Sequence, residues 1–159
     1  MHPEYPVAVD AASVAPRVMA ANAPAPFRGL NEGREKRTLG DLFGLTGFGV
    51  NLVRMAPGGR SALRHAHSHE DEFIYVIEGE AVLVTDRGET PLCAGMCAGF
   101  KAGSGDAHQL VNRSNADVLY LEAGARIAGD TVAYPDDDIA AVLDADHKRI
   151  FTRKDGTPY

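Results

Sequence analysis

The sequence predicts an all-β protein whose antiparallel strands form a sandwich or a barrel. Glycine and proline are frequent, with 17 and 9 of 159 residues, and tryptophan is absent, which favours many turns and few long helices. Short strand-like runs follow one another at similar spacing, separated by turns that contain glycine. Between Leu45 and Glu122 no segment supplies a helix, and this excludes an alternating β-α-β fold.

Residues 1–33 precede the predicted barrel. Alanine and proline dominate this segment, and neither a period of 2 nor one of 3.6 is sustained. We therefore expect an extended N-terminal arm that lies over the domain or over a partner subunit. The segment has no basic stretch followed by an unbroken apolar run, so no secretion signal is expected.

The barrel itself is expected over residues 34–130. A first strand, Phe48 to Met55, runs into the turn Ala56-Pro57-Gly58-Gly59. Further strand-like runs cover residues 61–67, 72–77, 81–85, 99–101, 108–112 and 118–122.

Residues 131–159 are expected to pack on the barrel as a short C-terminal helix and a tail. The helix is predicted over Pro135–Ala145, because three consecutive aspartates at 136–138 suit a helix N-terminus. Ile139, Val142 and Leu143 supply a short apolar stripe at helical spacing.

Charge, hydropathy and cysteine usage exclude several classes of protein. The 22 acidic and 16 basic residues give a net charge of −6, which does not favour a nucleic-acid partner held by bulk charge. No stretch approaches the roughly 18 uninterrupted apolar residues that span a bilayer. Cys93 and Cys97 cannot form a disulfide framework, and their spacing is not a common zinc spacing. We expect a cytoplasmic protein that binds a small-molecule ligand and neither nucleic acid nor a membrane.

Histidines gather in one part of the chain. His65, His67 and His69 occupy alternate positions, so a strand would place all three on one face. Glu72 opens an apolar core strand, and His108 stands at the start of another. Imidazole nitrogens and one carboxylate converging from neighbouring strands suit a divalent Fe, Mn, Ni, Zn or Cu ion. These residues alone leave open whether His65 and His67 or His67 and His69 form the first ligand pair.

Two spaced motifs contain these histidines and Glu72, and they read Gly59-x5-His65-x-His67-x4-Glu72-x6-Gly79 and Gly95-x5-Lys101-x-Gly103-x4-His108-x3-Asn112. They resemble the two motifs of the cupin superfamily. The first matches the family pattern at each defining position, and in the second Lys101 stands where the family usually has proline and two extra residues precede His108. The whole chain resembles small single-domain bacterial cupins, some described as sugar-phosphate isomerase-like or auxin-binding-like.

The resemblance implies a double-stranded β-helix, which is a jelly-roll barrel, with one divalent metal ion bound by His65, His67, Glu72 and His108. The register of the first motif selects His65 and His67 as the first pair. His69 is then expected on the same strand face, nearer the turn. Cupins of this kind are commonly dimers, and because exposed strand edges need cover we expect a homodimer.

Such a metal site would keep two adjacent open positions, which suit a bidentate oxygen ligand. We expect a metalloenzyme acting on a small oxygen-rich or anionic substrate, with isomerase-type or, for Fe(II), dioxygenase-type chemistry. The alternative is a non-catalytic cupin that binds a sugar or a carboxylate. No general base can be assigned. His69 and Tyr120 are candidates for substrate contact, and whether Tyr75, Gln109 and Glu122 face the pocket stays open.

Overall fold

A computed structural model describes residues 5–17, 27, 29, 32–143 and 149–159. Its helical elements are the 3-10 turn η1 (Ala11–Ser13) and α1 (Leu39–Leu42). Its strands are β1 (Arg34–Thr38), β2 (Phe48–Met55), β3 (Ala66–His67), β4 (Glu72–Glu78), β5 (Glu80–Thr85), β6 (Gly88–Cys93), β7 (Cys97–Phe100), β8 (Gln109–Val111), β9 (Val118–Ala125), β10 (Val132–Ala133), β11 (Ala140–Leu143) and β12 (Arg149–Thr152).

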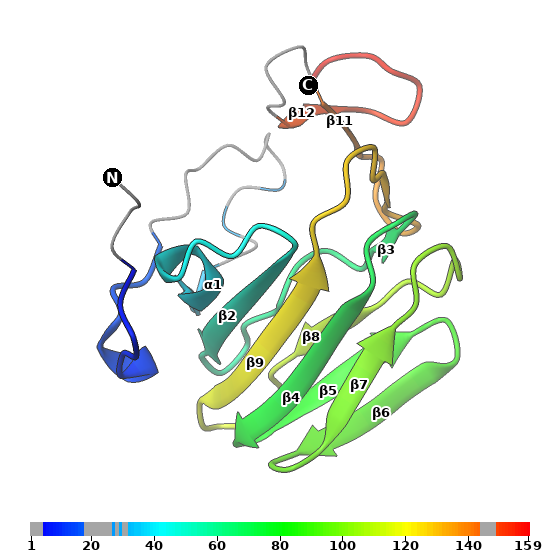
Figure 1. The fold of residues 1–159 in the computed structure, drawn as a ribbon. Helices are drawn as coiled ribbons and strands as arrows, with labels where there is room; N and C mark the ends of the chain where they lie inside the picture. The colour runs from blue at the N-terminus through cyan, green and yellow to red at the C-terminus, as the bar shows by residue number, and fades with distance from the viewer. Residues whose placement is uncertain (1–4, 18–26, 28, 30–31, 144–148) are drawn as a thin grey trace.

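Two antiparallel sheets face each other and enclose the core (Figure 1). The first has the strand order β1-β2-β9-β4-β7 and the second the order β6-β5-β8. A third sheet, β12-β11-β10-β3, lies at the upper end of the barrel in Figure 1. Strands far apart in sequence adjoin in both large sheets, as in a jelly roll: β9 lies between β2 and β4, and β8 lies beside β5. The predicted all-β, double-stranded β-helix fold is therefore confirmed.

The core lies between the two large sheets and follows from the alternation of side chains along their strands. On β2, β9 and β4 the register aligns Val53, Tyr120 and Val76, and all three are almost completely buried. Opposite them the second sheet contributes Leu83, Leu92 and Leu110. At about 25 cal/mol per Å² of buried apolar surface, this cluster is the main source of stability of the barrel.

The inner face of the five-stranded sheet changes from apolar to polar along its strands. Two residues beyond the Val53–Tyr120 pair, Asn51 lies opposite Glu122, and two residues further Gly49 lies opposite Gly124. Gly124 in turn is aligned with Glu72 on β4. Gly49 and Gly124 carry no side chain, so the inner face leaves space beyond the apolar core, at the end of the barrel near β3.

Some strand predictions were wrong in extent. The run 61–67 is mostly a series of bends, and only Ala66 and His67 pair as a strand. The strands β1 and β6 were missed. In β6 only Leu92 is buried, so the strand lacks the apolar alternation that would reveal it in the sequence, as is usual at a sheet edge.

The C-terminal helix predicted over Pro135–Ala145 was also wrong within the described residues. Residues 135–138 form bends, and residues 140–143 form β11, which pairs with β12. The aspartates bind elsewhere: Asp136 pairs with Arg64, and Asp138 accepts the backbone N–H of Lys154. A short apolar run is compatible with either a helix or a strand, and here pairing with β10 and β12 selects the strand.

The described part of the N-terminal arm docks at the edge of the barrel. The backbone N–H of Arg17 donates to the carbonyl of Lys36 on β1, at 2.8 Å. Residues 18–26 lie outside the described residues, so contact of the arm with a partner subunit stays a prediction. Among the described residues, no helix has the length and apolar character needed to cross a membrane.

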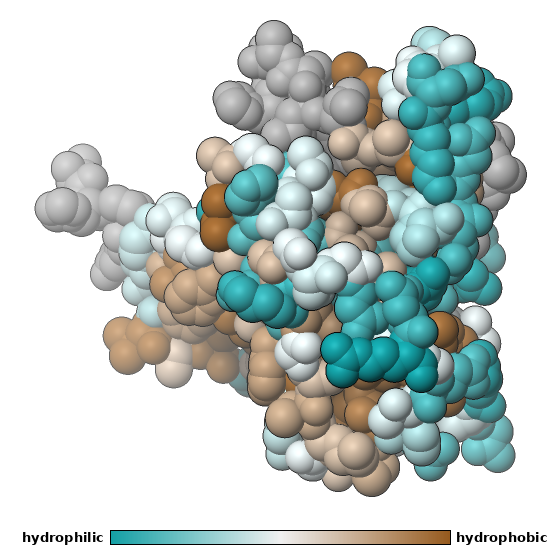
Figure 2. Space-filling view, turned by 90° about the vertical axis from the view of Figure 1, so that its right-hand side faces the viewer, coloured by the Kyte–Doolittle hydropathy of each residue, from teal (hydrophilic) through white to brown (hydrophobic). Residues whose placement is uncertain are grey.

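The outer face of the five-stranded sheet exposes apolar side chains. Phe73 and Tyr75 on β4 are 46% and 41% exposed, and Met96 beside them is 39% exposed. In Figure 2 hydrophobic residues gather over one half of the visible face and hydrophilic residues over the other. The homodimer stays a prediction.

Replacing Gly79 by alanine should destabilise the fold more than the same change at Gly58. Both glycines have φ near +80°, which costs a side-chain-bearing residue about 1–2 kcal/mol. A Cβ at Gly79 would also lie 2.4 Å from the backbone oxygen of Asp117, whereas at Gly58 it would meet nothing. Urea unfolding should therefore show at least twice the loss of unfolding free energy for Gly79→Ala. Equal losses in the two variants would contradict this account.

Candidate metal centre

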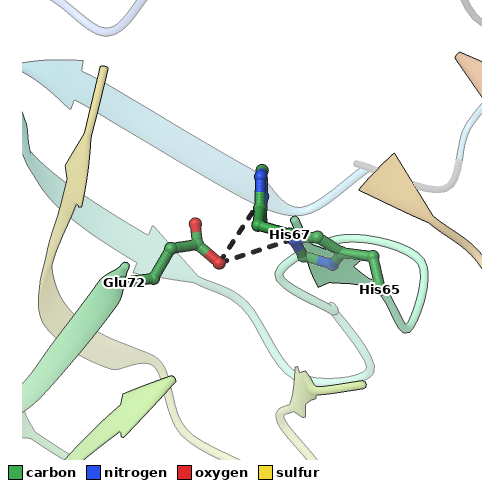
Figure 3. Close-up of side chains that lie close together, drawn as sticks. All are labelled: His65, His67 and Glu72. Atoms are coloured by element: carbon green, nitrogen blue, oxygen red, sulfur yellow. Dashed lines mark ion pairs between the residues drawn. The ribbon is translucent and has the colours of Figure 1, made fainter. Parts of the chain in front are cut away.

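Four polar side chains converge at the polar end of the barrel. Nε2 of His108, His67 and His65 lies 3.0, 3.6 and 3.7 Å from the same carboxylate oxygen, Oε2 of Glu72. Figure 3 shows His65 and His67 directed at this oxygen from one side. Ligands bonded at about 2.1 Å to one ion lie about 3 Å apart when they are neighbours, so these separations have the size of a coordination shell.

Backbone pairing places the four residues. His65 and His108 form an antiparallel bridge in which each N–H donates to the carbonyl of the other, at 3.1 and 2.8 Å. His67 lies on β3, two residues further along, and therefore on the same face. Glu72 opens β4, and Phe100 opposite it stacks flat on the His108 ring at 3.5 Å.

Hydrogen bonds to the far side of two rings fix their tautomers. Nδ1 of His65 lies 2.8 Å from the carbonyl of Leu63, and a carbonyl only accepts, so this nitrogen carries the proton. Nδ1 of His67 likewise donates to the carboxylate of Asp130 at 2.6 Å. In both rings Nε2 is left with its lone pair pointing toward Glu72, the state in which histidine binds metal.

Charge at the cluster favours the same ligand forms. Burial, and then the neighbouring His108, lower the pKa of His65, which keeps this imidazole neutral. Burial alone would raise the pKa of Glu72, but the nearby His108 and the positive charge that the three imidazoles carry when they are protonated outweigh it, so the pKa is lowered and the carboxyl is ionised. Neutral imidazoles and an anionic carboxylate are the protonation states that bind a divalent ion.

The cluster also has a polar atom that the described residues do not satisfy. Oε2 of Glu72 is buried, yet no hydrogen bond of acceptable geometry reaches it, and the same holds for Nδ1 of His108. A buried, unpaired carboxylate oxygen facing two nitrogen lone pairs is costly. A divalent cation between these atoms would offset that cost, so the donor set fits the ion that the sequence predicts.

Asp130 is a member of the site that sequence reasoning missed. Its side chain is 7% exposed, and besides His67 it accepts the backbone N–H of His69 at 2.8 Å. Burial alone would raise the pKa of Asp130, but these hydrogen bonds outweigh it and lower the pKa. Asp130 follows Gly129 in a turn beyond β9. It lies outside both histidine motifs, so the sequence did not predict its role.

The structure separates His69 from the other histidines. His69 is exposed and is not among the residues that line the cavity, and its Nδ1 lies 2.8 Å from the hydroxyl of Ser68. The expectation that it shares the strand face of His65 and His67 was wrong, because β3 ends at His67. Beyond it, Asp130 binds Ser68 and the N–H of His69 and bends the chain outward.

A cavity of about 350 Å³ adjoins the four converging residues. Tyr120 and Glu122 line it, whereas Tyr75 faces outward and the Gln109 amide donates to the carbonyl of Ala62. Tyr120 is 1% exposed, and its hydroxyl has no hydrogen-bond partner among the described residues. Burial, and then the charge of Glu122, raise the pKa of Tyr120, so the phenol is neutral and can donate a hydrogen bond.

Comparison with known proteins places this site in a family. The family model of the Cupin domain matches residues 51–124. The crystal structure of a sugar phosphate isomerase from a cupin superfamily, from Silicibacter pomeroyi, is 43% identical, covers 96% of each chain and superposes with a TM-score of 0.88. A protein from Acidithiobacillus ferrooxidans, named provisionally as a sugar phosphate isomerase, is 26% identical over 79% of this chain and 80% of its own, with a TM-score of 0.71.

More distant structures show the fold alone. The polyketide cyclase RemF from Streptomyces resistomycificus is 21% identical over 74% of this chain and 78% of its own, with a TM-score of 0.60. Among curated proteins, none matches the chain with significance. The identity and coverage of the Silicibacter pomeroyi protein, together with the domain match across both ligand motifs, show that this chain belongs to the cupin superfamily.

Proposed function

We propose that this cupin is a metal-dependent enzyme that acts on a small, oxygen-rich substrate by isomerase-type chemistry. The observation that carries the proposal is the buried oxygen of Glu72, which lies within 3.0–3.7 Å of three imidazole nitrogens at the wall of a cavity and has no hydrogen-bond partner among the described residues. The name of the 43% identical relative, a sugar phosphate isomerase, supports this reaction type.

His65, His67, His108 and Glu72 would hold one divalent ion, with Zn, Ni, Mn, Fe and Cu compatible with the donor set. A bound ion would supply Lewis-acid stabilisation of negative charge that develops on a substrate carbonyl or hydroxyl oxygen. The protein contributes rigidity, because Leu63 and Asp130 hold two of the rings from behind and Phe100 stacks on the third.

Isomerisation beside a carbonyl also needs a group that moves a proton. Glu122 is the candidate we favour, since it lines the cavity from β9, the strand next to that of Glu72. Its Oε1 accepts from the Asn51 amide at 3.1 Å and from the ammonium of Lys36, which fix the carboxylate in place. Tyr120 would donate its free hydroxyl hydrogen to the substrate.

The first prediction concerns the metal. Glu72→Gln and His67→Ala should each abolish stoichiometric binding of added Mn²⁺ or Zn²⁺ as measured by elemental analysis after desalting, whereas His69→Ala should bind as the parent does. Full metal occupancy in both site variants would contradict the assignment, and loss of metal in His69→Ala would show that the register is wrong by two residues.

The second prediction concerns Asp130. Asp130→Asn should weaken metal binding about 10- to 100-fold, because a histidine ligand loses the carboxylate that orients it and raises its basicity. Competition with a coloured chelator measures the affinity. Asp136→Asn is the matched control: Asp136 lies on the same C-terminal segment but pairs with Arg64 instead of a histidine. Equal weakening in both variants would assign the effect to loosening of the segment.

The third prediction separates an enzyme from a binding protein. We expect the metal-loaded protein to interconvert at least one member of a panel of sugar phosphates and 2-hydroxy carbonyl compounds, with the same rate in the absence of O2. Glu122→Gln should lower kcat by at least about 100-fold, in the range typical of a general base, while metal content and KM stay near the parent values. Saturable binding without turnover would establish the non-catalytic alternative, and turnover that requires O2 would establish dioxygenase chemistry.

A further inference from the structure

We propose that the cavity contains a second binding site, in which Arg34 and the hydroxyl of Tyr120 hold an oxyanion group of the ligand, a phosphate or a carboxylate, away from the metal centre. The inference rests on the proposed function in one respect: the same ligand would extend from this site to the metal. The charges and the unsatisfied donors of the cavity wall carry the proposal.

The edge strand β1 points alternate side chains into the cavity. Arg34 is aligned with Met55 and Lys36 with Val53, and both partners belong to the buried core of the barrel. Arg34 and Lys36 accordingly line the cavity. Two long cationic side chains thus enter the barrel interior from the β1 edge of the five-stranded sheet. The strands β2 and β9 separate this edge from β4 and Glu72.

None of the described acidic residues that line the cavity pairs with Arg34. Arg126 pairs with Asp41, Lys36 pairs with Glu122, and Glu72 belongs to the metal centre. The fourth, Glu70, accepts the backbone N–H of Ile127 and lies 3.8 Å from Nδ1 of His67. No ion pair joins Arg34 to any acidic side chain within the described ranges, although the residue is half-buried. Arg17 also lines the cavity without an ion pair among those residues, and its charge acts on Asp41, at the other end of β1.

The polar atoms of the same wall are unsatisfied as well. Nε of Arg34 and the hydroxyl of Tyr120 are both buried and have no hydrogen-bond partner in the part of the chain that the structure describes. A buried donor without an acceptor destabilises the protein, and more so when it is charged. A ligand oxygen that accepts from these donors would remove this cost.

Arg37 on the same strand shows the contrast. Its Nε is also buried without a partner, but its two Nη atoms lie 3.4 Å from the carboxylate of Glu35, and Arg37 does not line the cavity. The two arginines differ in the direction they face, and only the one that faces the cavity lacks an acidic partner.

Tyr120 connects the two ends of the cavity. It lies on β9, between the strands of Glu72 and of Val53, and the charges of both Glu72 and Arg34 act on its hydroxyl. A guanidinium offers several donors in a planar fork that matches carboxylate and phosphate oxygens. A ligand that spans this cavity would therefore chelate the ion with one end and present an anionic group to Arg34 with the other.

Titration calorimetry of inorganic phosphate and of acetate into the metal-free protein tests the site directly. We expect at least one of the two to bind, and Arg34→Gln to weaken that binding at least 10-fold. Arg37→Gln removes the same charge from the same strand and should leave the affinity unchanged. Arg34→Lys should retain part of the affinity, and Tyr120→Phe should weaken it while preserving the packed ring.

NMR measurement of the relaxation that Mn²⁺ causes at the phosphorus of bound phosphate then locates the anion relative to the metal centre. We expect a distance from manganese to bound phosphate well beyond that of direct coordination, and a parent-like Mn²⁺ content in Arg34→Gln as the control for folding. Preference for phosphate or for acetate identifies the anionic group. Binding that is insensitive to Arg34→Gln, that requires the metal, or that is absent for both anions would overturn the proposal. Failure of Mn²⁺ to bind would overturn the proposed function and leave the calorimetric test of Arg34 intact.

Discussion

The bridge between His65 and His108 is the constraint on which the site depends. Each residue donates its N–H to the carbonyl of the other, which is the closely bonded pair of an antiparallel ladder. Such a pair directs both side chains to one face, and the two ring centres lie only 4.7 Å apart. The two extra residues before His108 are therefore accommodated in the loop, without moving the imidazole. Once this bridge forms, β3 brings His67 to the same face and β4 brings Glu72 toward it.

The interior of the barrel is divided into an apolar and a polar part, and the division explains how a charged site is tolerated. Val53, Tyr120 and Val76 fill the lower rows, where burial of apolar surface stabilises the fold. Above them, Glu72 is exposed to the field of three imidazoles with little water to screen it. A protein that buries such a group without a counter-charge loses stability, so the barrel stabilises the site and an ion in turn would stabilise the barrel.

Most of the site could be predicted from the sequence, because its register is set by period-2 alternation and by two motifs that fix the histidines and Glu72 relative to glycines. The all-β fold could be predicted because short strand-like runs alternate with glycine-containing turns at similar spacing. Long-range packing could not be predicted. His69 departs from its strand face because Asp130, 61 residues later, binds its backbone. Within the predicted helix at 135–145, residues 140–143 form β11 because they pair with the adjoining strands β10 and β12, and β10 pairs in turn with the distant strand β3. Arg34 gave no signal, since its strand carries no apolar alternation.

The net charge of −6 describes the whole chain and not the cavity. Inside the barrel, Lys36 and Arg126 are each neutralised by an acidic neighbour, and Arg34 is not. Unpaired donors impose selectivity because a ligand that lacks matching acceptors leaves them desolvated, and such a mismatch discriminates more strongly than a missing apolar contact. A cation at the four-residue centre alone would accept any chelating oxygen compound. Combined with Arg34 and Tyr120, the same cavity would reject neutral chelators and retain those that carry an anionic group at the correct distance.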